Sequence, residues 1–182
     1  DWSSDVCSSD LLGLGVMATA PAQVLRSLGF DVCAWVRSPR PPGDIPLYAG
    51  MDQLAAFLGQ TDIVVCLLPL TPETRGILNA RTFAMMPKGA MIVNLGRGGH
   101  VVDADLIAAL DSGQLEHAAL DVTEPEPLPP SSPLWLHPKV TLMPHVARRP
   151  TVTQIVTEIA ANIASLRAGG GLLQEIDVKL GY

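Results

Sequence analysis

The sequence has few charged and few aromatic side chains: 16% of its 182 residues are charged and 4% are aromatic, whereas 48% are hydrophobic. The formal net charge is -6 and no run of basic residues occurs, which argues against nucleic acid or an anionic membrane as a partner. No apolar run reaches the length of a membrane span, and we find no leader of the secretory type. The composition suits one compact domain with a well-filled core.

Cysteine and histidine are scarce, and neither residue type forms a pattern. Cys33 and Cys66 lie in apolar, strand-like runs, which predicts buried thiols and fits a cytoplasmic location. We predict no metal site, because ligand spacing is missing among the four histidines, His100, His117, His137 and His145.

The sequence does contain a regular alternation of apolar and amphipathic stretches. Strand-like runs occur at residues 11–12, 30–36, 45–48, 62–68, 90–93, 117–122 and 139–143. Helical spacing occurs at residues 16–28, 51–58, 79–85, 103–110 and 152–166. This alternation predicts an α/β fold, a Rossmann-like doubly wound parallel sheet.

A glycine-rich turn follows the first strand-like run. Gly13 and Gly15 belong to the pattern G-x-G-x-x-A. Such glycines permit a tight turn and close approach of a pyrophosphate, and the next helix would offer N–H groups from Val16 and Met17. The pattern alone is a weak signal, and Pro21 removes a backbone donor near the start of the helix.

We therefore divide the chain into three parts. Residues 11–147 are expected to form a dinucleotide-binding domain. Residues 148–182 are expected to form a C-terminal helix and tail. Residues 1–10 show neither helical nor strand periodicity, and we expect a non-native or disordered leader there.

The end of the second strand-like run indicates which dinucleotide would bind. NAD sites usually place an acid about twenty residues beyond the glycines, where it holds the ribose hydroxyls. Here Arg37, Ser38 and Arg40 occupy that stretch, and no acid follows before Asp44. Two cations and a hydroxyl suit a 2′-phosphate, so NADP (NADPH) is favoured over NAD. An ordinary basic turn is the alternative interpretation.

The turn after residues 62–68 offers further candidate contacts to the cofactor. Pro69, Leu70 and Thr74 would present backbone amides and a hydroxyl at the carboxyl end of a strand. A plain turn explains this segment almost as well.

An arginine stands in a glycine-rich turn after the apolar run at residues 90–93. Leu95 and Gly96 open the turn, Arg97 follows, and Asp103 is expected to cap the next helix. Ligands of open α/β sheets bind at the carboxyl ends of strands, and an arginine can bind a carboxylate through two parallel hydrogen bonds. A solvated loop arginine explains this stretch equally well.

Two other polar residues, Glu126 and His145, also follow predicted strands at their carboxyl ends. One crevice could gather both of them with Arg97. Reduction of a 2-keto acid needs a cation for the carboxylate, a hydride donor, and a proton donor for the developing alkoxide. A histidine beside a carboxylate suits the last role. Taken singly, each residue also fits an ordinary turn or loop.

Three motifs, in this order, resemble the D-isomer-specific 2-hydroxyacid dehydrogenase family, and within it the glyoxylate/hydroxypyruvate reductases. They are Asn94-Leu95-Gly96-Arg97-Gly98, Asp121-Val122-Thr123-Glu124-Pro125-Glu126-Pro127-Leu128-Pro129 and Pro144-His145-Val146-Ala147. The resemblance covers residues 11–182. It implies the cofactor-binding part of an NADPH-dependent reductase of a small 2-keto acid, glyoxylate or hydroxypyruvate, which is a homodimer in its full-length form.

The resemblance also implies a role for individual residues. Arg97 would bind and polarise the keto acid, His145 would be the general acid/base, and Glu126 would favour the protonated form of that histidine. Glu124 competes with Glu126, but the family pattern places the acid directly before Pro-Leu-Pro. Asp121 would contact the nicotinamide carboxamide.

The family's N-terminal substrate domain has no counterpart in this sequence, so the 182-residue chain alone is expected to be weakly active or inactive. The helix at residues 152–166 would return to that domain, and its apolar stripe is expected to be exposed. Two alternatives stay open. An NAD-dependent member, such as a phosphoglycerate dehydrogenase, would prefer NADH. An NAD(P)-sensing, corepressor-like binding module would keep its cellular role without Arg97 or His145.

Overall fold

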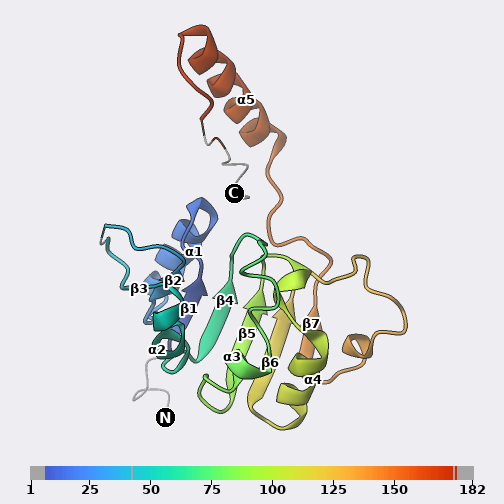
Figure 1. The fold of residues 1–182 in the computed structure, drawn as a ribbon. Coiled ribbons are helices and arrows are strands. Elements are labelled where there is room, and N and C mark those ends of the chain that lie inside the picture. The colour runs from blue at the N-terminus through green and yellow to red at the C-terminus, as the bar shows by residue number, and fades with distance from the viewer. Residues whose placement is uncertain (1–6, 42, 174, 176–182) are drawn as a thin grey trace. The chain divides into compact units, whose positions relative to one another are not determined.

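The computed structural model describes residues 7–41, 43–173 and 175. The chain divides into two compact units, and the division falls between Pro144 and His145. The first unit holds a seven-stranded sheet in which neighbouring strands all pair in parallel, in the order β3-β2-β1-β4-β5-β6-β7 (Figure 1). The predicted Rossmann-like, doubly wound fold is confirmed.

Helices separate most consecutive strands of the first unit, as the sequence predicted, although β3 follows β2 with no helix between them. The strands are β1 (Ser9–Leu12), β2 (Ala34–Val36), β3 (Leu47–Ala49), β4 (Ile63–Cys66), β5 (Ala90–Asn94), β6 (Leu115–Leu120) and β7 (Val140–Leu142). The α-helices are α1 (Val16–Ser27), α2 (Leu54–Leu58), α3 (Ala80–Phe83) and α4 (Asp103–Asp111). Three short 3-10 helices, η1 (Met51–Gln53), η2 (Gly98–His100) and η3 (Pro133–Trp135), complete the unit.

Strand β1 shows how the sheet divides the core into two layers. Leu12 packs in the larger cluster, which includes buried side chains of α2, α3 and α4. Its neighbour Leu11 packs in a second cluster with Ala18 and Ala22 of α1. Successive side chains of a strand point to opposite faces, so a strand covered on both faces needs a continuous apolar run. The uninterrupted runs in the sequence therefore predicted a sheet with helices on both sides.

The first strand begins earlier than the sequence predicted. Ser9 and Asp10 belong to β1 and are buried. The Asp10 carboxylate accepts hydrogen bonds from the N–H of Cys33 (2.7 Å) and from the hydroxyl of Thr61 (2.8 Å). The expected ten-residue leader is therefore wrong for Ser9 and Asp10, because two donors satisfy a carboxylate that would otherwise be costly to bury. The first six residues lie outside the described part of the chain.

Other local predictions can be compared with the structure. Strand β2 covers only the end of the stretch predicted at residues 30–36. Helix α4 begins at Asp103, but Val102 is its cap residue, so Asp103 lies in the first turn.

Cys33 and Cys66 are buried, as predicted. Burial is the main cause that raises the pKa of both thiols, to about 12 for Cys66, and keeps them in the unreactive protonated form.

The second unit contains α5 (Val152–Arg167), which matches the predicted C-terminal helix. Its first turn has a capping box: Thr151 accepts from the N–H of Gln154, and the Gln154 side chain accepts from the N–H of Thr151. No residue of α5 is buried, and Ile159 has 54% of its surface exposed. The apolar stripe is thus exposed, while its return to a substrate domain stays a prediction.

In the part of the chain that the structure describes, no helix has both the length and the apolar character needed to cross a membrane. The same residues include no group of three or more histidine, cysteine, aspartate or glutamate side chains placed to hold a metal ion.

Candidate active site at the carboxyl edge of the sheet

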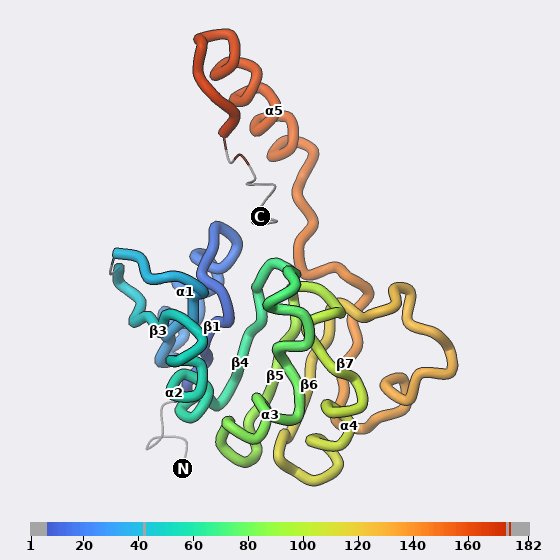
Figure 2. The backbone as a smooth tube through the Cα atoms, viewed as in Figure 1, coloured from blue at the N-terminus to red at the C-terminus, as the bar shows by residue number. Residues whose placement is uncertain are grey.

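The parallel sheet brings most of the candidate residues to one edge. Because all strands run in the same direction, their carboxyl ends share that edge, and the loops after β1, β4, β5 and β6 leave the sheet there (Figure 2). In doubly wound sheets, ligands bind at this edge, where the strand order reverses. Here the reversal falls between β1 and β4, which are neighbours in the sheet.

The glycine turn after β1 leads directly into helix α1. Gly13 has a φ of +96°, and a Cβ there would lie 3.3 Å from the carbonyl of Leu67, so any side chain would crowd the end of β4. Gly15 precedes α1, and a Cβ at that position would meet nothing within 4 Å. Val16 and Met17, in the first turn of α1, are exposed. The open helix N-terminus fits the pyrophosphate of a dinucleotide.

The basic loop after β2 lies beside this turn. The N–H of Gly13 donates to the carbonyl of Trp35 at the end of β2 (2.9 Å). Arg40 reaches back from the loop, and its Nη1 donates to the carbonyl of Leu14 (2.6 Å). Arg37 is half-buried, and Ser38 and Arg40 are exposed. Two arginines and a hydroxyl beside the glycine turn fit a phosphate on the adenosine ribose.

The turn after β4 uses the candidate hydroxyl internally. Thr74 is 5% exposed, and its hydroxyl donates to the carbonyl of Pro69 (2.7 Å) and accepts from the N–H of Thr71 (2.8 Å). Pro69 and Leu70 are half-buried at the edge of the sheet. The hydroxyl of Thr74 therefore shapes the turn, which is what the plain-turn interpretation expects.

Arg97 follows β5 in a turn that a buried asparagine organises. Asn94 Oδ1 accepts from the N–H of Gly96 (3.1 Å), and Asn94 Nδ2 donates to the carbonyl of Arg97 (2.9 Å). The preceding residue, Leu95, is half-buried. Arg97 is exposed, and its Nη1 donates to the carbonyl of Gly96 (2.7 Å). Among the described residues, no carboxylate forms an ion pair with Arg97, so its charge is available to an incoming anion.

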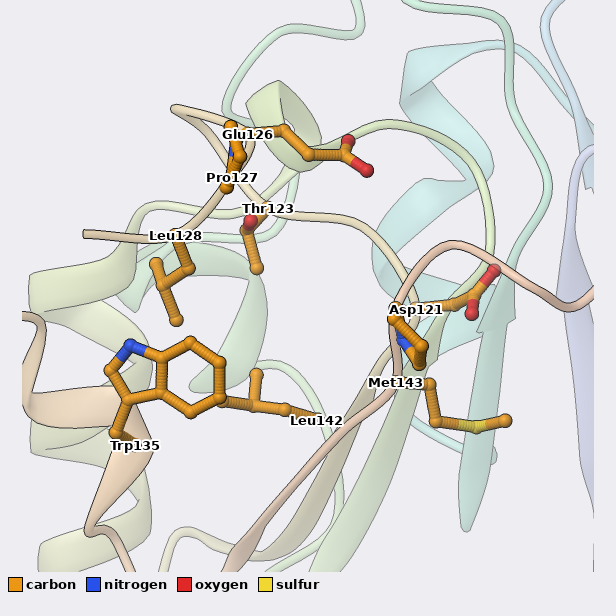
Figure 3. Close-up of a pocket in the computed structure, with 9 residues that line it drawn as sticks. Asp121, Thr123, Glu126, Pro127, Leu128, Trp135, Leu142 and Met143 are labelled. Carbon is orange, nitrogen blue, oxygen red and sulfur yellow. The ribbon is translucent and has the colours of Figure 1, made fainter. Parts of the chain in front are cut away.

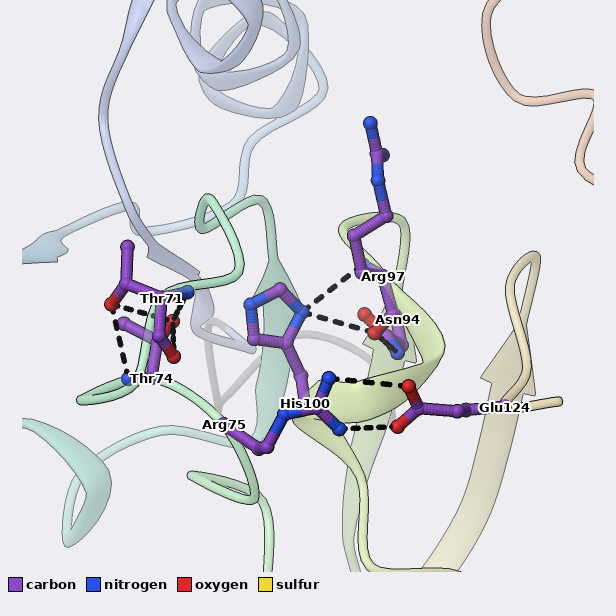
Figure 4. Close-up of polar contacts among 7 residues, drawn as sticks. All are labelled: Thr71, Thr74, Arg75, Asn94, Arg97, His100 and Glu124. Carbon is purple, nitrogen blue, oxygen red and sulfur yellow. Dashed lines mark hydrogen bonds and ion pairs between the residues drawn. The ribbon is translucent and has the colours of Figure 1, made fainter. Parts of the chain in front are cut away.

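His100 lies under this turn and was not among the predicted site residues. Its side chain is fully buried, and its Nδ1 lies 3.0 Å from both the N and the O of Arg97 (Figure 4). Its Nε2 lies 3.3 Å from the carbonyl of Pro69. Burial is the main cause that lowers the pKa of His100, and the charges of Arg97 and Arg75 act in the same direction. His100 is therefore neutral at pH 7. A histidine three residues after the arginine, at the end of η2, is the sequence signal that marks it.

The loop after β6 packs directly against the Arg97 turn. A Cβ on Gly98 would overlap the backbone carbonyl of Thr123. The next residue along, Glu124, forms an ion pair with Arg75, and Arg75 is the main cause that lowers the pKa of Glu124. Glu124, the acid that competed with Glu126 in the sequence, thus has a structural partner.

A cavity of about 290 Å³ lies where β6 and β7 end. Asp121 and Glu126 line it together with apolar side chains, among them Leu128, Trp135 and Leu142. Figure 3 shows the carboxylates of Asp121 and Glu126 pointing away from the ring of Trp135. The cavity therefore combines an apolar wall with two acidic groups, which is the usual character of a small-molecule site.

Besides the candidate cofactor residues after β1 and β4, the first unit brings Arg97 after β5 and Asp121 and Glu126 after β6 to the same edge. Asp121 is buried, and its N–H donates to the carbonyl of Asn94 (3.0 Å), which joins the ends of β5 and β6. His145 is the first residue of the second unit and has a φ of 53°. Its convergence with Arg97 and Glu126 stays a prediction.

Comparison with known proteins identifies the family. Residues 9–147 match the family model described as D-isomer specific 2-hydroxyacid dehydrogenase, NAD binding domain. The chain is 46% identical over 172 residues to glyoxylate/hydroxypyruvate reductase A of Serratia proteamaculans (strain 568), a match that covers 94% of this chain and 55% of that protein. The chain thus spans about half the length of this curated relative.

Two solved structures are also similar. One is a D-isomer specific 2-hydroxyacid dehydrogenase from Xanthobacter autotrophicus Py2 in complex with NADPH and MES (TM-score 0.91, 42% identity, 97% of this chain and 73% of that chain). The other is an NADPH-dependent glyoxylate/hydroxypyruvate reductase from Sinorhizobium meliloti in complex with NADP and sulfate (TM-score 0.90, 40% identity, 97% of this chain and 57% of that chain). The chain belongs to the D-isomer specific 2-hydroxyacid dehydrogenase family, of which it carries the NAD binding domain.

Proposed function

We propose that the complete protein reduces a small 2-keto acid, glyoxylate or hydroxypyruvate, to the 2-hydroxy acid with NADPH. The observation that carries this proposal is the exposed guanidinium of Arg97, which has no carboxylate partner among the described residues and stands on the sheet edge that bears the glycine turn. The relatives from Serratia proteamaculans and Sinorhizobium meliloti, both named as reductases of these two keto acids, support the choice of substrate.

The residues around the glycine turn fit NADPH. The N-terminus of α1 would hold the pyrophosphate, and the basic loop after β2 would hold the 2′-phosphate. When bound, the cofactor would supply a hydride. The residues that we assign to its site are Gly13, Gly15, Val16, Met17, Arg37, Ser38, Arg40, Pro69, Leu70, Thr74, Leu95, Gly96 and Asp121, with Thr74 acting through the shape of its turn.

Three residues would act on the keto acid itself. Arg97 would bind the carboxylate through its two terminal nitrogens and draw electron density from the neighbouring carbonyl. His145 would donate a proton to the carbonyl oxygen as it becomes an alkoxide, and Glu126 would stabilise the protonated imidazole. The reverse proton transfer would serve oxidation of the 2-hydroxy acid.

The binding step can be tested on the 182-residue chain. Titration of the chain with NADPH and with NADH, followed by nucleotide fluorescence, should give tighter binding of NADPH. Preference for NADH would instead favour the NAD-dependent alternative. The chain alone should oxidise NADPH slowly, if at all, with glyoxylate, because half of a water-excluding cleft would be missing.

The reaction can be tested on the complete protein, with the N-terminal domain restored. Glyoxylate and hydroxypyruvate should each support oxidation of NADPH, and Arg97→Ala should lower kcat/KM by about a hundredfold or more. Arg81→Ala, a substitution of an exposed arginine on α3, should leave it unchanged. If neither keto acid raised the rate above background, the proposed function would be wrong.

A further inference from the structure

The backbone of Arg97 is fixed by a buried ring that the proposed chemistry does not use. His100 bridges two strand ends: one ring nitrogen faces the N–H of Arg97 after β5, and the other faces the carbonyl of Pro69 after β4. Figure 4 shows the ring between the Thr71–Thr74 turn and Arg97. A Cβ on Gly96 would lie 2.9 Å from ring atoms of His100, so the ring packs directly on the backbone of the turn.

The hydrogen-bond partners assign the tautomer of this ring. The carbonyl of Arg97 already accepts a hydrogen bond from Asn94 Nδ2 (2.9 Å). The N–H of Arg97 donates to Nδ1 of His100 (3.0 Å), so this nitrogen must carry no proton. In a neutral ring the proton is then on Nε2, which can donate to the carbonyl of Pro69 (3.3 Å), an oxygen that also accepts from the Thr74 hydroxyl. A second proton, on Nδ1, would remove the acceptor of the Arg97 N–H.

We propose that neutral His100 is a positioning residue for the keto acid, because its Nδ1 accepts from the N–H of Arg97 and so fixes the backbone that carries the guanidinium. The guanidinium would then meet the substrate carboxylate at a constant distance from the cofactor. This inference rests on the proposed function, since it assigns to His100 the placement of the group that binds the substrate. Its contribution should appear in substrate affinity, because the fully buried side chain of His100 acts through the backbone of Arg97.

The protonation of His100 should make the KM for glyoxylate depend on pH. The cations Arg97 and Arg75 both oppose protonation of the ring, and Glu124, the nearby anion, is paired with Arg75. Because the folded-state pKa is lowered from 6.5, the ring stays neutral at pH 7 and becomes charged only at more acidic pH. The KM for glyoxylate should therefore be constant near neutrality and rise in acid as the Arg97 N–H loses its acceptor.

Two substitutions of His100 each remove one of the two hydrogen bonds of the ring. In His100→Asn the side-chain oxygen can take the place of Nδ1 and accept from Arg97, whereas the bond to Pro69 is lost. In His100→Gln the amide nitrogen can take the place of Nε2 and donate to Pro69, whereas the acceptor for Arg97 is lost. In the complete protein, His100→Gln should raise the KM for glyoxylate by about five- to tenfold, the effect of one lost hydrogen bond. In His100→Asn the KM should stay within about twofold of the unsubstituted value.

Further measurements on the same variants distinguish a misplaced Arg97 from a misfolded protein. The KM for NADPH should be unchanged in both variants, and kcat should change less than the KM for glyoxylate. His117→Asn, on β6 and hydrogen-bonded to Thr141, is the matched control and should have no effect. The acid rise in KM should be absent from His100→Asn, which cannot titrate. This last readout stands even if His100→Gln fails to fold.

The outcomes distinguish this inference from the function on which it rests. If the unsubstituted protein reduced neither glyoxylate nor hydroxypyruvate, the proposed function would fail and the inference with it. If it did, and both variants had the unsubstituted KM or were impaired equally, only the positioning role would be overturned.

Discussion

The guanidinium of Arg75 binds the carboxylate of Glu124 through both of its terminal nitrogens. About half of each side chain is exposed, and the pair lies against the backbone of Gly99. It connects the segment after β4 with the loop after β6, which are 49 residues apart in the sequence. Since ion pairs in solvent contribute little to stability, we expect this pair to act mainly on the placement of the loop.

The first prediction concerns the acid stability of this pair. Arg75 lowers the pKa of Glu124 from 4.5 in the folded state. A group whose pKa is lowered by folding stabilises the protein fully at pH values above its unfolded-state pKa. This stabilisation is lost as the pH falls from the unfolded-state pKa through the folded-state pKa. Arg75→Gln should therefore flatten the decline of unfolding free energy between about pH 5 and pH 3. Urea unfolding at a series of pH values checks this, and Arg81→Gln should retain the original slope.

The second prediction concerns the contact between the Arg97 turn and the following loop. Gly98→Ala would place a methyl group on the backbone of Thr123, and backbone cannot yield as a side chain can. The unfolding free energy should fall by about 2 kcal/mol or more, as measured by urea unfolding. A matched control is Gly43→Ala, where a Cβ would meet nothing within 4 Å. Equal stability of the two variants would contradict the contact.

The third prediction separates cofactor binding from folding at the glycine turn. A methyl group at Gly15 would enter open space at the N-terminus of α1, where we place the pyrophosphate. Gly15→Ala should leave urea unfolding unchanged and weaken NADPH binding by about tenfold or more. Fluorescence titration of the 182-residue chain measures the affinity. Unchanged affinity would mean that the pyrophosphate binds elsewhere.

The fourth prediction concerns the buried carboxylate of β1. Asp10→Ala leaves the N–H of Cys33 without its acceptor, whereas the hydroxyl of Thr61 can still donate to the carbonyl of Phe57. The unfolding free energy should decrease by about 2 kcal/mol, the cost of one unsatisfied buried donor. Asp31→Ala removes an exposed carboxylate and should change stability by less than about 0.5 kcal/mol. If the two variants unfolded at the same urea concentration, the role of Asp10 would be refuted.

The fifth prediction concerns the choice between the two nucleotides. If Arg37 contacts the 2′-phosphate, Arg37→Asp should weaken NADPH binding by about tenfold or more through charge repulsion, and should leave NADH binding within about twofold. Parallel titrations of the variant with both nucleotides check this. Equal loss of both affinities would indicate a disturbed fold around β2 instead of a lost phosphate contact.

The sheet was predictable because its central strands carry their signal locally. Strand β4 and strand β5 are apolar on both faces, which only a covered parallel strand requires. Asp10 carries no such signal, because its partners Cys33 and Thr61 lie 23 and 51 residues away. For this reason Asp10 was predicted to belong to a leader and not to the first strand.

In the candidate site, too, local sequence signals were informative and contacts between distant residues were not. Arg97 and Gly15 follow β5 and β1, so their place at the carboxyl edge of the sheet was predictable from sequence alone, while their contacts to a ligand stay a prediction. The residues that support them were not predictable in this way. His100 meets Pro69 across 31 residues, and Arg75 meets Glu124 across 49, so these pairs exist only once the strands are side by side.

The absence of a side chain at Gly98 has a consequence for how this protein can vary. Two parts of the sequence, one carrying Arg97 and the other leading to Glu126, share a boundary with no room for a single carbon atom. A larger residue at Gly98 would fit only if the backbone of the loop after β6 moved away. We expect the two motifs to diverge together, as one inherited unit, and a graft of either motif alone into a distant relative to disturb the geometry of both.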